Sequence, residues 1–164
     1  MKKTYKVLDG IALIMKRLLK ILGCIVLVLI IAILGWIIFI PIVNDSTAEQ
    51  VAKRLEEIPL PEKTELLETK SLAGKLVGCG NGMQYFGAIL VKSDLALDEL
   101  KVYYGKYAND EYECIVEIQD TQQIQQVENE DLVFDSDMDS GDYFIVYSWE
   151  DNGNFLCALD LRAN

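Results

Sequence analysis

The hydrophobic pattern divides the chain into one uninterrupted apolar run and a longer region in which apolar and polar residues alternate. The run, Ile21 to Val43, contains no charged residue over 23 positions. As a helix rising about 1.5 Å per residue it would be roughly 34 Å long, enough to cross a hydrocarbon core of about 30 Å. It also lacks the polar stripe of a helix that packs on a soluble core. The pattern therefore predicts a transmembrane helix at residues 21–43.

The charges that flank this run indicate its orientation. Asp9 is the one acidic residue before the run, and 25 acidic and nine basic residues follow it. The bases that precede the run are Lys2, Lys3, Lys6, Lys16, Arg17 and Lys20. The positive-inside rule makes residues 1–20 a cytoplasmic basic segment and places the C-terminal region outside the cytoplasm. We therefore expect a cell-membrane protein with a single span.

A cleaved signal peptide is the alternative reading of the same run. Ser46 and Ala48 occupy the positions that small residues take before a cleavage site. However, the apolar run is longer than the h-region of a signal peptide, which has about 7 to 15 residues. This length favours a retained membrane anchor.

A short helix is predicted directly after the apolar run. Ser46 and Glu49 have the spacing of a capping box, which indicates a helix over residues 47–57. Pro59 would end this helix, because proline disfavours helical geometry in the residue before it. Residues 44–63 are therefore expected to form a juxtamembrane helix and a linker.

Residues 64–164 have the pattern of a domain of short strands and one clear helix. Apolar runs on either side of Gly78–Gly82 predict a hairpin with Asn81-Gly82 in its turn, and Asn152-Gly153 predicts a second hairpin. Strands are expected at 64–78, 84–93, 112–118, 143–149 and 155–161, a helix at 93–107, and either a short helix or a loop at 120–131. Hairpin links imply a mainly antiparallel sheet with one or two helices packed on one face, the α+β class.

Two of these elements have a predicted inward face. Strand 112–118 alternates, which indicates a half-buried strand with one set of residues inward: Tyr112, Cys114, Val116 and Ile118. The helix carries an apolar stripe formed by Ala96, Leu100, Tyr103 and Tyr107. Leu97 and Tyr104 widen this stripe. Ser93 or Asp94 is expected to cap the N-terminus of this helix.

Charge and composition exclude several classes of function. The region after the apolar run has a formal charge of −16, and residues 107–161 contain fifteen acids and no base. Such a field repels nucleic acid and attracts metal ions or basic proteins, so the expected partners are the lipid bilayer around residues 21–43 and a basic protein. The chain has no histidine. This excludes Ser-His-Asp and Cys-His catalysis and histidine-bearing zinc sites.

The stretch DSDMDSGDY, residues 135–143, is the strongest candidate for a metal site. Its carboxylates at alternate positions are Asp135, Asp137 and Asp139. In an EF-hand loop the sixth position is glycine and the twelfth is glutamate, but here these positions are Ser140 and Val146. The stretch therefore predicts an acidic turn between strands. The alternative is an irregular calcium loop on the three aspartates, completed by Asp142; no other cofactor is expected.

Aromatic residues and cysteines are expected mainly in the core. If one surface recognises a partner, the first candidates are Tyr104, Tyr107 and Trp149, because aromatic side chains dominate binding surfaces. Cys114 and Cys157 are predicted to be small buried residues. A disulfide between these two cysteines is the alternative.

Three stretches within residues 59–149 bear on the location of the protein: PLPEKTEL, AGKLVGCGNGMQYFGAILVKSDLALDELKVYY and DYFIVYSW. Together they resemble a group of small uncharacterised membrane- or lipid-anchored exported proteins of Gram-positive bacteria. This group has no established activity, so the resemblance implies an exported location and gives no residue a role.

The expected function is partner binding by a non-catalytic α+β module that a single-pass membrane protein displays at the cell surface. An accessory, sensing or immunity role would fit this expectation. One alternative is a structural module stabilised by calcium. Another is an enzyme that acts on envelope material through carboxylates such as Asp135, Asp137 or Glu150.

Overall fold

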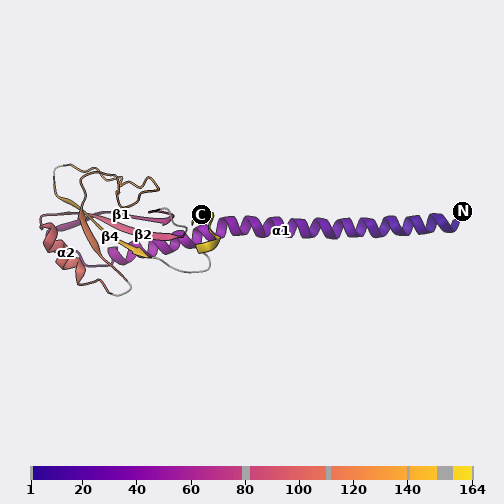
Figure 1. Ribbon diagram of the computed structural model, residues 1–164, viewed down its shortest axis with the longest axis horizontal. Coiled ribbons are helices and arrows are strands. Elements are labelled where there is room, and N and C mark those ends of the chain that lie inside the picture. Colours follow the sequence, from indigo (N-terminus) through magenta and orange to yellow (C-terminus); the bar gives the residue numbers. More distant parts are fainter. Residues whose placement is uncertain (1, 79–81, 110–111, 140, 151–156, 164) are drawn as a thin grey trace. The chain divides into compact units, whose positions relative to one another are not determined.

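The computed structural model describes residues 2–78, 82–109, 112–139, 141–150 and 157–163; residues 2–12 and 163 are described by their backbone alone. The chain forms two compact units, Met1–Phe39 and Ile40–Asn164 (Figure 1). Helix α1 (Lys2–Glu56) begins in the first unit and ends in the second.

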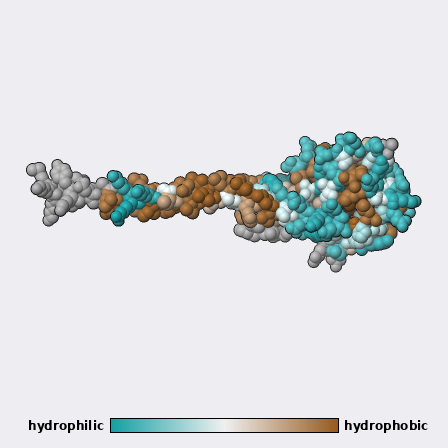
Figure 2. All heavy atoms as spheres, turned by 180° about the vertical axis from the view of Figure 1, so that it is seen from behind, coloured by the Kyte–Doolittle hydropathy of each residue, from teal (hydrophilic) through white to brown (hydrophobic). Residues whose placement is uncertain are grey.

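The first unit consists of α1 alone. Every described side chain from Leu13 to Phe39 is exposed, and most of them are apolar. Figure 2 colours most of this helical surface brown, for hydrophobic residues. Among the described residues, α1 is the one helix that is long and apolar enough to cross a membrane. The prediction of a single N-terminal helix of this kind is confirmed.

The prediction of a separate helix that starts at the capping box is wrong. Helix α1 continues without a break through Ser46 and ends at Glu56. Its last turns bury Val51 and Leu55 in the core of the second unit, so tertiary packing outweighs the local capping signal. Residues 40–56 therefore belong to the folded domain and do not form a juxtamembrane spacer.

The second unit contains a four-stranded antiparallel sheet, which confirms the α+β prediction. Its strands are β1 (Thr64–Gly74), β2 (Gln84–Ser93), β3 (Ile115–Ile118) and β4 (Tyr143–Glu150), in the order β1-β2-β4-β3. Helix α2 (Leu97–Gly105) follows β2, and two 3₁₀ turns, η1 (Cys157–Leu159) and η2 (Leu161–Ala163), follow β4. The described residues thus place one strand, β4, after the irregular segment that residues 119–139 and 141–142 describe.

The end of α1 and helix α2 pack on the same face of the sheet. Leu55 of α1 and Leu100 of α2 share one buried cluster with Ile89 and Val146 of the sheet. Alternation along the central strands supplies these inward residues, since every second side chain of a strand points to the same face. This packing confirms the expected layer of helices on one face.

The other face of the sheet is covered by the segment between β3 and β4, whose described residues, 119–139 and 141–142, form no helix or named strand. Ile124, Val127 and Phe134 from this segment pack on Phe86 and Ile145. Both faces of the sheet are therefore buried. The predicted inward face of strand 112–118 is confirmed for Tyr112, Cys114 and Val116, which pack in the cluster that contains Leu55 and Leu100. The strand itself begins only at Ile115, whose side chain packs against the second cluster, and Ile118, also expected to point inward, is 56% exposed.

The two predicted hairpins differ in outcome. β1 and β2 pair as expected, but β1 ends at Gly74, and the side-chain oxygen of Gln84 accepts hydrogen bonds from the backbone N–H groups of Leu76 and Val77, both at 2.9 Å. Asn81 and the whole of the second turn lie outside the described residues. The predicted strand over 155–161 is wrong from Cys157 onward, where the chain forms the turns η1 and η2.

Helix α2 is shorter than predicted and its inward face is shifted. Leu100 and Tyr104 are buried, whereas Ala96 and Tyr107, the ends of the predicted stripe, are exposed. The helix begins after Ala96, whose backbone N–H donates to the Glu99 carboxylate at 2.9 Å. This carboxylate therefore satisfies a donor at the start of the helix, and the expected cap at Ser93 or Asp94 is not used.

Candidate functional site

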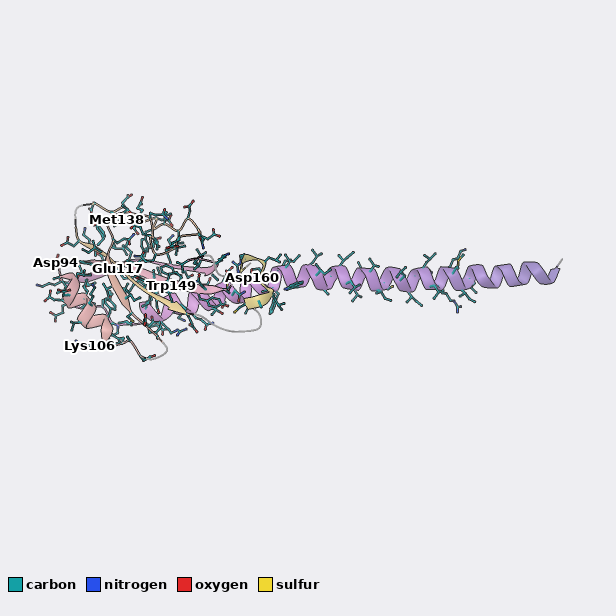
Figure 3. The ribbon with its side chains drawn as sticks, viewed as in Figure 1. Asp94, Lys106, Glu117, Met138, Trp149 and Asp160 are labelled. Carbon is teal, nitrogen blue, oxygen red and sulfur yellow. The ribbon has the colours of Figure 1, made fainter. Side chains whose placement is uncertain are left out.

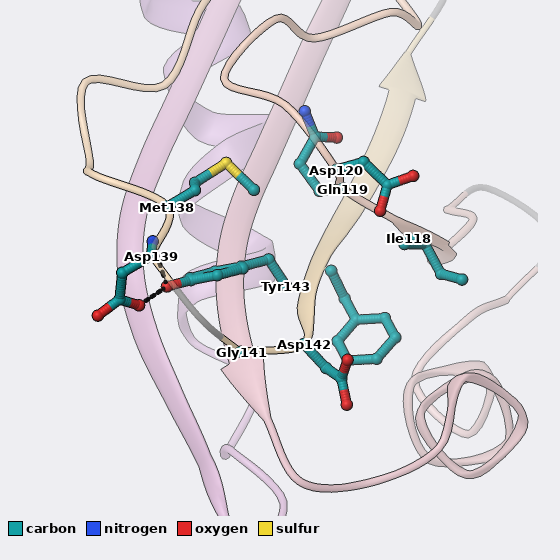
Figure 4. Close-up of a pocket in the computed structure, with 9 residues that line it drawn as sticks. Ile118, Gln119, Asp120, Met138, Asp139, Gly141, Asp142 and Tyr143 are labelled. Atoms are coloured by element: carbon teal, nitrogen blue, oxygen red, sulfur yellow. Dashed lines mark hydrogen bonds between the residues drawn. The ribbon is translucent and has the colours of Figure 1, made fainter.

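The candidate site is a small pocket where the end of β3, the start of β4 and the irregular segment meet (Figure 4). Its volume is about 160 Å³. The residues that line it are Ile118, Gln119, Asp120, Met138, Asp139, Gly141, Asp142, Tyr143 and Phe144. Pockets for drug-sized ligands usually measure about 300 to 1,000 Å³. This pocket is therefore suited to a group the size of one amino-acid side chain.

The pocket combines some apolar surface with an acidic rim. Met138 is half-buried and Tyr143 is buried, so a thioether and one aromatic ring supply the apolar surface, whereas Phe144 packs in the cluster on the other face of the sheet. The three aspartates among the lining residues are all exposed and belong to two separate parts of the irregular segment. A group that fits this environment has an apolar stem and a positive charge.

Tyr143 is held in place by Asp139 and Lys92. Its hydroxyl donates to the Asp139 carboxylate and accepts from the Asp139 backbone N–H at 3.1 Å (Figure 4). The Lys92 ammonium lies 3.0 Å from Asp139 Oδ1 and 5.3 Å from the centroid of the Tyr143 ring. The hydrogen bond from Tyr143 and then the one from Lys92 lower the pKa of Asp139. Asp139 is therefore a carboxylate at neutral pH.

Gln119 fixes the wall of the pocket at the end of β3, next to this tyrosine. Its side-chain nitrogen donates to the carbonyl oxygens of Thr121 at 2.7 Å and of Gln123 at 2.8 Å. Its backbone N–H donates to the Tyr143 carbonyl at 2.9 Å. These bonds turn the chain sharply after β3 and present Asp120 at the rim.

The structure divides the predicted calcium ligands between two places. Asp135 pairs with Lys70 of β1 at 2.6 Å, while Asp139 lines the pocket and pairs with Lys92 of β2 at 3.0 Å. Asp137 is exposed and does not line the pocket. In the described part of the chain, no group of three or more Asp, Glu or Cys side chains is arranged to hold a metal ion. The pocket instead combines Asp139 with Asp142 and Asp120.

The stretch around Asp135 is held by a second cluster of charges, on β1. Glu68 accepts hydrogen bonds from the backbone N–H of Asp135 at 3.1 Å and from the N–H and hydroxyl of Ser136, both at 2.8 Å. Lys70 lies 2.7 Å from the same carboxylate. Glu68 thus anchors the irregular segment to the sheet.

The predicted partner residues do not form one surface. Tyr104 is fully buried in the core, which corrects its assignment as a contact residue. Tyr107 is 39% exposed in the turn that follows α2, next to Tyr103. Trp149 packs on Phe86, with ring centroids 4.8 Å apart, on the opposite face of the sheet.

The carboxylates considered for catalysis are also separated. Glu150, at the end of β4, forms an ion pair with Arg54 of α1. Asp135 is paired with Lys70 on the other face of the sheet. The structure therefore does not bring Glu150 and Asp135 together as an acid–base pair.

Cys114 and Cys157 are both described and are not bonded to each other. Cys157 is buried beside the Tyr85 hydroxyl, 3.0 Å away, whereas Cys114 packs against the cluster that contains Tyr104. Burial raises the pKa of the Cys114 thiol. The alternative of a disulfide between them is wrong.

Sequence reasoning missed Gln119 and Asp120 as parts of a site. The available signal was their position directly after an alternating strand, where side chains of a loop can gather at the end of a sheet. Comparisons of the chain with family models, with curated proteins and with solved structures gave no match.

Proposed function

We propose that this chain is a single-pass membrane protein whose α+β domain lies outside the cytoplasm and binds a basic protein partner at the cell surface. The acidic pocket is the observation that carries the proposal. The charge asymmetry around residues 21–43 supports the orientation. The resemblance to exported proteins of Gram-positive bacteria supports the same location, and an accessory, sensing or immunity role fits it.

The proposed ligand group is the end of a lysine or arginine side chain. Its methylene stem would contact Met138 and the ring of Tyr143, and its cationic head would meet the carboxylates at the rim. Charges at such an exposed rim interact modestly one by one, but Asp120 and Asp142 act together around one pocket, next to Asp139, which is already paired with Lys92. The −16 charge of the region after the apolar run would also steer a basic protein toward the domain.

Binding is favoured over carboxylate catalysis by the environment of the acids. A catalytic general acid needs a raised pKa, which usually comes from burial. Asp120, Asp139 and Asp142 are all exposed, and the pKa of Asp139 is lowered. We therefore propose a module that recognises a cation without chemical change.

A binding measurement on the full chain in lipid nanodiscs tests this proposal. The probe is a fluorescent peptide of alternating lysine and glycine, whose affinity is measured by anisotropy. The double variant Asp120→Asn/Asp142→Asn removes two charges from the pocket rim. We expect it to weaken binding by about tenfold, as for the loss of charge contacts worth about 1.4 kcal/mol.

The matched control removes the same charge elsewhere. Glu130 and Asp131 are exposed and do not line the pocket. The variant Glu130→Gln/Asp131→Asn should therefore change affinity only slightly, through the overall field. Equal weakening in both variants would show that the peptide binds the general negative charge, and the pocket would lose its proposed role.

A further inference from the structure

The turns η1 and η2 are tied to α1 by a network of buried polar contacts. Asp160, which lies beside α1 in Figure 3, accepts a hydrogen bond from the Asn44 side chain at 2.7 Å. Both side chains are almost completely buried. Asn44 in turn accepts from the Tyr85 hydroxyl of β2 at 2.8 Å. The C-terminal turns are therefore held to α1, and α1 is held to the sheet.

Arg162 adds a second set of contacts to the same part of α1. Its guanidinium lies 2.7 Å from Asp45 and 2.8 Å from Asp160, and it donates to the Pro41 carbonyl oxygen at 3.3 Å. Burial raises the pKa of Asp160, but hydrogen bonds from Arg162 and Asn44 outweigh this effect and lower the pKa to about 2. Asp160 and Arg162 thus remain an ion pair at neutral pH.

These contacts place η2 at a defined level along α1. Val43 is the last residue of the apolar run. Pro41 lies two residues before it and Asp45 two residues after it, so each is about 3 Å from Val43 along the helix axis. The interfacial layer of a bilayer is about 5 to 7 Å thick on each side, because a core of about 30 Å lies within a total of about 40 to 45 Å. If residues 21–43 span the bilayer, η2 lies at the depth of its outer interface.

Leu161 stands between the two residues of this network and points away from the core. It is 69% exposed, although Asp160 before it is buried. Ile42, at the same level of α1, is also exposed. Transfer of a leucine side chain out of water is favourable. The adjacent arginine is compatible with the headgroup region of a bilayer.

We propose that Leu161 inserts into the outer interface of the lipid bilayer, so that η2 is a second point of contact between the domain and the membrane. This inference rests on the proposed function, because it requires α1 to span the bilayer. The lipid is the proposed occupant because the contacts of Arg162 and Asp160 hold Leu161 level with the end of the apolar run. A second copy of the chain is the competing occupant.

Tryptophan quenching in vesicles tests the proposal on the full chain. In a Trp36→Phe/Trp149→Phe background, Leu161→Trp places a single fluorophore at η2. The matched control in the same background is Val102→Trp on α2, where the native side chain is 66% exposed. The vesicles contain phosphatidylcholine brominated at the headgroup end of its acyl chains, and iodide is the aqueous quencher.

We expect bromolipid to quench Leu161→Trp severalfold more than Val102→Trp, and iodide to show the reverse order. Equal behaviour of the two variants would overturn the proposal. Shielding of Leu161→Trp from both quenchers would also overturn it, and would assign the surface to a second copy. Because Leu161 is exposed, the substitution should leave the unfolding temperature unchanged, which is measured on the same samples.

A third variant separates failure of this inference from failure of the proposed function. Trp149→Phe leaves Trp36, inside the apolar run, as the one fluorophore. If bromolipid does not quench Trp36, the membrane span itself is wrong. If it quenches Trp36 but not Leu161→Trp, the span stands and the second contact is wrong.

Discussion

Gly87 of β2 lies directly against the backbone of Ala52 in α1. A Cβ atom at Gly87 would lie 2.7 Å from the Ala52 Cα and 2.7 Å from the carbonyl carbon of Val51, closer than such atoms approach in proteins. Its partner across the sheet is Ser148, another small and fully buried residue. The helix packs this closely on the sheet because both positions lack a large side chain.

Replacing Gly87 by alanine should therefore destabilise the domain. The added methyl group forces α1 away from the sheet, and overpacking of this kind costs about 1 to 3 kcal/mol in free energy of unfolding. The measurement is thermal unfolding of the full chain in detergent, followed by the fluorescence of Trp149. Gly105→Ala is the control, since a Cβ there meets no atom within 4 Å. A similar loss in both variants would mean that the contact with Ala52 is not the cause.

The lowered pKa of Glu68 predicts that the stability of the domain depends on pH. Partial burial raises the pKa of Glu68, but hydrogen bonds from Lys70, Asp135 and Ser136 outweigh it and lower the pKa from 4.5 to about 2. A pKa lowered by folding adds stability that is fully present above pH 4.5 and is lost as the pH falls toward 2. We expect urea unfolding to show this loss.

Variants identify the group that is responsible for the loss. Glu68→Gln should be less stable at neutral pH and should lose less stability between these two pH values than the native chain. Asp160, whose pKa is also lowered to about 2, contributes in an overlapping range, so Asp160→Asn is measured in parallel. Glu65→Gln, at an exposed position of the same strand, is the control. A native slope that survives in Glu68→Gln would contradict the assignment.

Calcium should stabilise the chain no more than magnesium does. Lys70 and Lys92 already neutralise Asp135 and Asp139, and general screening depends mainly on the charge and concentration of the ion. A true site with a dissociation constant of 10 μM would add about 2.7 kcal/mol at 1 mM calcium, a shift of several degrees. The measurement is the unfolding temperature in each cation.

The triple change of Asp135, Asp137 and Asp139 to asparagine is the corresponding variant. It should leave the response to calcium unchanged. A stabilisation that is specific to calcium and disappears in this variant would instead establish the stretch as a metal site.

The proposed orientation predicts the location of the C-terminus. A phosphatase that folds only outside the cytoplasm, fused after Asn164, should be active in intact cells. The same fusion to a reporter that works only in the cytoplasm should be inactive. The control is a chain in which Lys16, Arg17 and Lys20 are replaced by glutamate, which weakens the positive-inside signal and should reduce export of the fused reporter. Cytoplasmic activity of the native fusion would refute the orientation.

The parts of the fold that could be predicted from sequence are those with a regular period. The charge-free run gave the apolar part of α1, and β2 and β4 were recognisable because their residues are apolar and β-branched or aromatic. The continuity of α1 through Ser46 could not be predicted. It depends on the burial of Val51 and Leu55 against strands that follow much later in the chain.

The layer opposite the helices has no periodic signal. Its buried residues, Ile124, Val127 and Phe134, are irregularly spaced in the sequence. Contacts with the sheet hold them in place, and not a local helix or strand. The pocket shares this origin. The acidic stretch drew attention to Asp139 and Asp142, but Asp120 joins them only because β3 pairs with β4 and ends beside them.

The contact between Asn44 and Asp160 joins residues that are 116 positions apart in sequence. Asn44 is therefore synthesised long before its partner exists, and the strands between them must be made before the contact can form. Contacts between residues so far apart form slowly, because the intervening chain loses conformational entropy before the contact stabilises the fold. The domain can therefore reach its final form only after Asp160 has been made, so the end of α1 must wait for a partner that all four strands precede.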